Sequence, residues 1–164
     1  MLRIKSIFSS MLLVSVLSIT AQALPNYPQG PDLVLTPGVL CTTPDAIRYP
    51  EKIPYCNRNV KPALKWVIIE TYMKKFNFAI DDSNRDNFKI DHFIPLCMGG
   101  ANDIKNLWPQ YKSVYEVTDE LEFVLCERLS EGKITQAHAI EKMKYGKLHL
   151  DQVSGLINEA NGLR

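Results

Sequence analysis

Apolar and polar positions divide the chain into a short apolar leader, an irregular proline-rich stretch and a series of helices and strands. The leader has a basic start, Arg3 and Lys5, followed by a serine-interrupted apolar run at 7–19 and by Ala21-Gln22-Ala23. These are the three parts of a secretory signal peptide, with cleavage after Ala23. The apolar run is shorter than the ~20 apolar residues of a membrane-spanning helix. The pattern therefore predicts a signal peptide at 1–23 and no membrane anchor after cleavage.

The mature part begins with a stretch that carries no helical or strand periodicity. It contains the prolines Pro25, Pro28, Pro31 and Pro37, which favour an extended lead-in at 24–37. Cleavage would take 23 residues from the 164 and leave 141, a length typical of one domain with a single core. We therefore expect one domain at 38–164.

Helical spacing recurs in several places. From Pro62 to about residue 76, apolar residues predict a core-facing helix, with its stripe at Trp66, Ile69, Met73 and Phe76. A second stripe ends near Ser130 and consists of Val114, Val117, Leu121, Val124 and Leu125. Two shorter helices are expected at about 135–145 and 150–160, with breaks at Gly132 and Gly146.

Two strands are predicted between the long helices. Residues 88–96 form the first, followed by a turn at Gly99-Gly100, and a short second strand around Leu107-Trp108 ends at Pro109. The order strand, turn, strand and helix predicts a mainly helical α+β fold. Its centre would be a hairpin followed by a helix, with one helix before it and others after it.

Four cysteines lie in the mature part: Cys41, Cys56, Cys97 and Cys126. An even number in an exported chain indicates two disulfides, with three connectivities. Because no C-x-x-C pair is present, zinc ligation is the weaker interpretation. We favour the pairs Cys41-Cys56 and Cys97-Cys126.

Net charge does not indicate a nucleic-acid partner, but charge distribution is uneven. Loss of Arg3 and Lys5 leaves 17 of the 19 basic side chains against 18 acidic ones, a net charge of −1. Seven basic residues lie at 48–75, whereas 116–131 holds six acidic residues and one arginine. The basic stretch could face phosphates, although such a run is also typical of a solvated helix face.

The chemically informative segment begins at Asp91-His92. A carboxylate suits a hard cation such as Mg²⁺, and a neutral imidazole accepts a proton near pH 7. Phosphodiester hydrolysis uses both functions. Neighbours on a strand point to opposite faces, so Asp91 and His92 serve one site only if the strand is distorted there.

The residues around this pair occur in a recognisable register. Asp91-His92, Ile94-Pro95-Leu96, Gly99-Gly100, Asn102-Asp103 and 106–110 (Asn-Leu-Trp-Pro-Gln) resemble the D-H-x-I-P-L-x-x-G-G-x-N-D-x-x-N-L-W-P-Q pattern of bacterial and phage HNH endonucleases. The resemblance extends more loosely to C-x-R-x-V at 56–60 and to D-x-L-E at 119–122. It implies a ββα-metal fold formed by the hairpin and the following helix.

The resemblance also implies roles for individual residues. His92 would be the general base and Asp91 a metal ligand, while Asn106 would orient the loop and the base. The family usually has a second ligand, His or Asn, near Tyr115, and tyrosine is a poor Mg²⁺ ligand. Glu116 is the first candidate to replace it, and Asp119 the second.

These inferences together favour an exported endonuclease, periplasmic or secreted, that acts as a monomer on DNA in preference to RNA. Its metal would be Mg²⁺, with Mn²⁺, Ca²⁺ and Zn²⁺ as alternatives, and Arg58 and Lys61 would contact phosphate. The second hypothesis is an exported HNH-like scaffold that has lost a ligand and binds nucleic acid or protein. The two hypotheses differ in what faces Asp91 across the hairpin. A carboxylate from Glu116 or Asp119 would favour the enzyme, and Tyr115 in that space would favour the scaffold. A purely structural envelope protein would leave the register unexplained.

Overall fold

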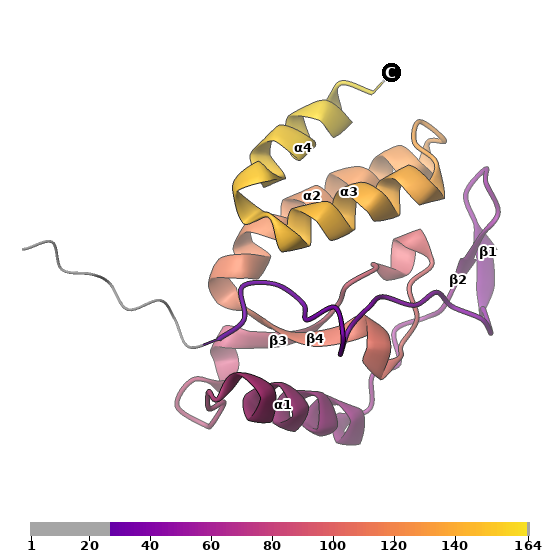
Figure 1. The fold of residues 1–164 in the computed structure, drawn as a ribbon. Helices are drawn as coiled ribbons and strands as arrows, with labels where there is room; N and C mark the ends of the chain where they lie inside the picture. The colour runs from indigo at the N-terminus through magenta and orange to yellow at the C-terminus, as the bar shows by residue number, and fades with distance from the viewer. Residues whose placement is uncertain (1–26, 164) are drawn as a thin grey trace, which may run out of the picture.

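The centre of the protein is an antiparallel hairpin with helices on two sides (Figure 1). The structure is a computed structural model that describes residues 27–163, so the expected signal peptide lies outside the described residues. The hairpin consists of β3 (Phe88–His92) and β4 (Leu107–Tyr111). Helix α1 (Pro62–Phe76) lies on one side, and α2 (Lys112–Ser130), α3 (Gln136–Leu148) and α4 (Val153–Asn161) lie on the other. This confirms the predicted α+β class and the order of hairpin and helix.

Both strands differ from their expected bounds. β3 ends at His92 instead of continuing to residue 96, because the chain turns at Pro95 into a short 3₁₀ helix at Leu96–Met98. β4 continues through Pro109, which pairs with Ile90. Proline is tolerated there because each strand of a two-stranded sheet has an unpaired edge. A Cβ on Gly100 would lie 1.7 Å from the Ile94 carbonyl oxygen, so the turn requires glycine.

Helix α1 has its predicted bounds but a different buried face. Ile68, Ile69 and Tyr72 are buried against the hairpin, whereas Trp66 is 57% exposed and Phe76 36% exposed. The expected stripe was therefore wrong at both aromatic residues. The helix is apolar over a wide arc, and the hairpin covers only the part of it that includes Ile68.

The three C-terminal helices form a second apolar cluster with the loop after β3. Its fully buried members include Leu121, Leu125 and Met143. Gly146 was expected to break a helix, but α3 continues through it to Leu148. A Cβ at that position would lie 2.5 Å from Leu121 Cδ2, so this glycine allows α3 to approach α2 closely.

Both favoured disulfides are confirmed. Cys41 bonds Cys56 and Cys97 bonds Cys126, with Cα atoms 6.0 and 5.8 Å apart. The first lies beside a small hairpin of β1 (Ala46–Arg48) and β2 (Ile53–Tyr55) that the sequence pattern did not predict. Two disulfides indicate an oxidising compartment.

The proline-containing segment before residue 38 packs on the domain. Tyr27 stacks on Tyr111 with ring centroids 3.6 Å apart, and the buried Thr36 hydroxyl lies 2.7 Å from the Tyr72 hydroxyl. Across residues 27–163, no helix has the combined length and apolarity needed to cross a membrane.

Candidate functional site

Strand β3 directs Asp91 and His92 to different surroundings, as alternation along a strand requires. Asp91 points toward the α2 and α3 side, where its carboxylate meets Lys147. The His92 ring instead contacts Arg58 and Asn102. Both residues are buried, with 8% of Asp91 and 3% of His92 exposed. The two side chains are therefore neighbours in sequence but do not point at a common site.

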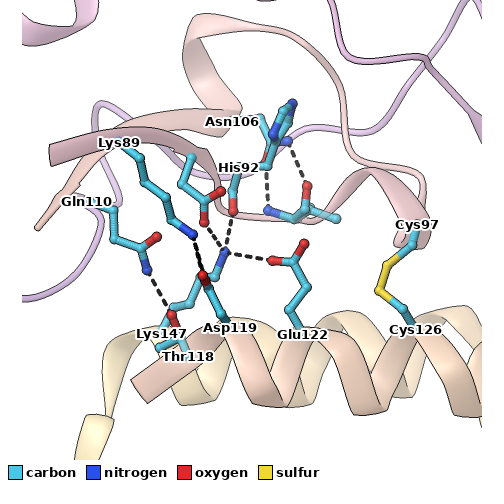
Figure 2. Close-up of polar contacts among 12 residues, drawn as sticks. Lys89, His92, Cys97, Asn106, Gln110, Thr118, Asp119, Glu122, Cys126 and Lys147 are labelled. Carbon is cyan, nitrogen blue, oxygen red and sulfur yellow. Dashed lines mark hydrogen bonds and ion pairs between the residues drawn. A yellow bond between two sulfur atoms is a disulfide. The ribbon is translucent and has the colours of Figure 1, made fainter. Parts of the chain in front are cut away.

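The ammonium of Lys147 connects three parts of the site. Its Nζ lies 2.8 Å from Asp91 Oδ2 and 3.5 Å from Glu122 Oε2, and it donates to the backbone carbonyl of His92. Figure 2 shows Glu122 pointing from its helix toward the hairpin, with dashed contacts meeting at Lys147. Lys147 is completely buried. One cation from α3 thus binds the hairpin and α2 together.

The charges of this cluster stabilise one another. Burial by itself would raise the pKa of Asp91, but the charges of Lys147 and Lys89 together with the hydrogen bond from Lys147 hold the pKa below the usual range. Burial opposes the charge on Lys147, yet Asp91 and Glu122 raise its pKa above that of a free lysine. Burial raises the pKa of Glu122, with Lys147 acting in the opposite direction. Asp91 and Lys147 therefore form a charged pair at neutral pH.

The His92 ring is held on both nitrogens. Arg58 Nη1 lies 3.3 Å from Nδ1, and Asn102 Oδ1 lies 3.1 Å from Nε2. Burial, opposed by the Asp91 charge, lowers the pKa of His92 to about 4. The ring is therefore neutral at pH 7, as a base must be, but it is a weak base and is shielded from solvent.

Asn106 is fully buried and acts as a clamp on the loop between the strands. Its Oδ1 accepts from the Ile94 N–H at 2.9 Å, and its Nδ2 donates to the carbonyls of Ile94 at 2.9 Å and Ala101 at 3.0 Å. The Asn106 carbonyl also accepts from the Phe93 N–H at 2.7 Å. Asn106 thus orients the loop next to His92 without contacting the imidazole through its side chain.

The two helix carboxylates favoured by the sequence are paired with lysines other than Lys147. Glu116 pairs with Lys112 at 3.8 Å, and its side chain is 58% exposed. Asp119 Oδ1 pairs with Lys89 Nζ at 2.6 Å, and its side chain is 52% exposed. Tyr115 also contacts Lys89, whose Nζ lies 4.8 Å from the ring centroid.

Glu122 is the acidic side chain of α2 that shares a cation with Asp91. It lies one helical turn after Asp119 and one before Cys126, so these three positions follow one side of the helix. The Cys97–Cys126 disulfide turns this side toward the loop after β3. The position of Glu122 along this side of α2 therefore places its carboxylate next to Lys147.

The expected metal does not fit the observed arrangement. Within residues 27–163, no group of three or more His, Cys, Asp or Glu side chains is placed to hold a metal ion. Asp91 is bonded to an ammonium, and both ring nitrogens of His92 have partners. Mg²⁺ demands octahedral coordination by oxygen, which this donor set does not provide.

Of the two expected phosphate contacts, Arg58 lies beside His92. Arg58 is exposed but anchored, with Nη2 donating at 2.6 Å to the Ile90 carbonyl. Lys61 is an exposed residue at the N-terminus of α1. A polar depression of about 400 Å³ lies next to them and is lined in part by Asn57, Asn59 and Asn102.

Comparison of the chain with known protein families, curated proteins and solved structures finds no match. The HNH resemblance therefore rests on the motif residues alone.

Sequence reasoning missed Lys147 entirely and did not assign a role to Glu122. Glu122 had a signal, because it belongs to the D-x-L-E segment of the resemblance. Lys147 had none. A lysine in a helical segment normally lies in solvent, and nothing local distinguishes one that reaches into the core.

Proposed function

We propose that this chain is an exported nucleic-acid-binding module built on an HNH-type scaffold. The observation that carries the proposal is the placement of Arg58, an exposed residue whose guanidinium is bonded to the β3 backbone and to His92. The sequence predicts a phosphate contact for this arginine. Its two hydrogen bonds hold the guanidinium next to His92, the expected general base.

Neighbouring residues extend this basic surface. Lys61 is exposed, and Lys65, partly exposed, follows one helical turn later, with its N–H bonded to the Lys61 carbonyl. Among the described residues, none of these three basic side chains takes part in a salt bridge with a carboxylate. Cations without a protein counter-ion are suited to phosphate contacts. We call Arg58, Lys61 and Lys65 the basic patch.

Binding is favoured over cleavage because of the state of the two central residues. The Asp91 carboxylate is paired with Lys147, and the His92 imidazole is buried with a pKa of about 4. Neither group is available to a substrate in this arrangement. DNA is the preferred partner in the proposal, and RNA the alternative.

Metal-dependent endonuclease activity is the second candidate. The observation in its favour is Glu122, a helix carboxylate that shares the Lys147 ammonium with Asp91. The Asn106 clamp also agrees with the role implied by the HNH resemblance. Activity of this kind would require Lys147 to leave the carboxylates.

Fluorescence anisotropy with labelled double-stranded DNA, single-stranded DNA and RNA tests the proposal, using oxidised mature protein over a range of salt concentrations. If the basic patch contacts three phosphates, Arg58→Gln/Lys61→Gln/Lys65→Gln should lower the slope of log affinity against log salt by about three. Lys74→Gln, at the exposed far end of α1, is the matched control and should behave like the parent. Absence of binding by the parent at low salt would reject the proposal.

A further inference from the structure

We propose that the Lys147 ammonium is a built-in cation that takes the place of a divalent metal between Asp91 and Glu122. The chain then binds no divalent ion at this position unless Lys147 is removed. This inference is independent of nucleic-acid binding. It rests on the donor count, the burial and the anchoring of one side chain.

The donors of Lys147 match the oxygens around it. An ammonium has three N–H donors and no acceptor. Nζ has three oxygen partners: Asp91 Oδ2, Glu122 Oε2 and the carbonyl of His92. Every donor therefore has an acceptor, and the buried charge meets the condition under which burial is tolerated.

The same three oxygens are the kind that a hard cation prefers. Carboxylates and backbone carbonyls coordinate Ca²⁺ and Mg²⁺, but these ions need six or more ligands. With Lys147 in place, a second cation would share the same oxygens with an ammonium of like charge. Coulomb repulsion at such short range disfavours simultaneous occupancy.

The backbone holds Lys147 firmly at the site. It lies in the last turn of α3, where the helix dipole favours a cation. The preceding Gly146 brings α3 close to Leu121 of α2. The Lys147 side chain has no exposed surface from which to exchange with solvent. The cation is thus a fixed part of the packing between α3 and the hairpin.

Removing Lys147 should open a metal site. Lys147→Ala leaves Asp91 and Glu122 facing a space vacated by the lysine, into which water and a cation can enter. We expect this variant to take up one Mn²⁺ per chain in a paramagnetic-resonance titration. Its melting temperature should rise by about 5 °C or more at saturating Mn²⁺. Lys144→Ala, one turn earlier on α3, is the matched control and should show neither effect.

The melting temperature of the parent protein provides a measurement that does not depend on the folding of a variant. It should be the same in Mn²⁺, Ca²⁺ and EDTA. In a second measurement, Asp91→Asn, where it folds, should not change Mn²⁺ uptake relative to the parent. If Lys147→Ala folds only with Mn²⁺, the proposal gains support, and if it never folds, the parent titration decides. Stoichiometric Mn²⁺ binding by the parent that Asp91→Asn removes would overturn the proposal. A folded Lys147→Ala that neither takes up Mn²⁺ nor gains thermal stability from it would also overturn the proposal.

Discussion

Lys147 Nζ lies 2.8 Å from Asp91 Oδ2, although the two residues are 56 positions apart in the chain. Neither side chain is accessible enough to exchange this partner for water: Lys147 is fully buried and the Asp91 side chain is 11% exposed. The bond joins α3 to the end of β3. The candidate site is therefore also a structural junction, and its residues affect stability as well as chemistry.

The first prediction concerns the coupling of this pair. Lys147→Met should lower the free energy of unfolding by about 3–5 kcal/mol, because it leaves the Asp91 carboxylate buried without its cation. Lys147→Met/Asp91→Asn should lose less than the sum of the two single changes. Urea unfolding of the four proteins measures the coupling. Strict additivity would mean that the two groups do not interact.

His92 should make stability depend on pH. Burial lowers its folded-state pKa to about 4, below the usual value of 6.5. As the pH falls from about 6.5 to about 4, the unfolded chain binds a proton that the folded chain does not, so stability decreases. The loss attributable to this group is on the order of 3 kcal/mol.

Urea unfolding of the parent and of His92→Gln between pH 7 and pH 4 measures this contribution. The variant should lose about 3 kcal/mol less than the parent over that range. His138→Gln changes an exposed histidine and should follow the parent curve. Parallel curves for the parent and His92→Gln would contradict the buried, neutral state of His92.

Asn106→Ala should weaken the loop after β3. The change leaves the buried N–H and carbonyl of Ile94 without partners, at a cost of about 1–3 kcal/mol for each, and also removes a donor from the part-buried Ala101 carbonyl. Amide hydrogen exchange should report the loss first at the Ile94 N–H. Asn59→Ala alters an exposed asparagine and serves as the control. Unchanged protection at Ile94 would show that the clamp is not needed.

The disulfide between Cys97 and Cys126 should be a large contributor to stability. It closes a loop across a sequence separation of 29 residues, for which chain entropy gives about 3–4 kcal/mol. Cys97→Ser/Cys126→Ser should lower the free energy of unfolding by about this amount and loosen α2 next to Glu122. Chemical denaturation measures the first effect, and hydrogen exchange in α2 the second. A variant as stable as the parent would contradict this assignment.

The sequence predicted the elements better than the contacts of the site. Periodicity located α1 and α2 because each has a long apolar face. The even cysteine count indicated two disulfides but left three connectivities open, of which the favoured one is observed. Periodicity does not show which part of a broadly apolar helix is buried, and for that reason Trp66 was wrongly predicted to face the core. The three-residue strands β1 and β2 are too short to give a pattern.

The site was less predictable because its decisive contacts are not local. The motif located Asp91, His92 and Asn106 together, since they lie within one hairpin. The partner of Asp91 comes from α3, and which carboxylate of α2 shares it depends on how α2 is placed against the hairpin. The placement of a helix is fixed by tertiary packing, which a single sequence does not specify.

The most direct test of the central claim, that this scaffold binds nucleic acid without cutting it, is an incubation with supercoiled plasmid and with single-stranded RNA. Oxidised mature protein is assayed in Mg²⁺, Mn²⁺, Ca²⁺, Zn²⁺ and EDTA, and gels resolve both mobility shifts and strand breaks. We expect a salt-sensitive shift with no breaks in any of the five conditions. Metal-dependent nicking by the parent that disappears in both Asp91→Asn and His92→Ala would contradict it and establish the endonuclease instead.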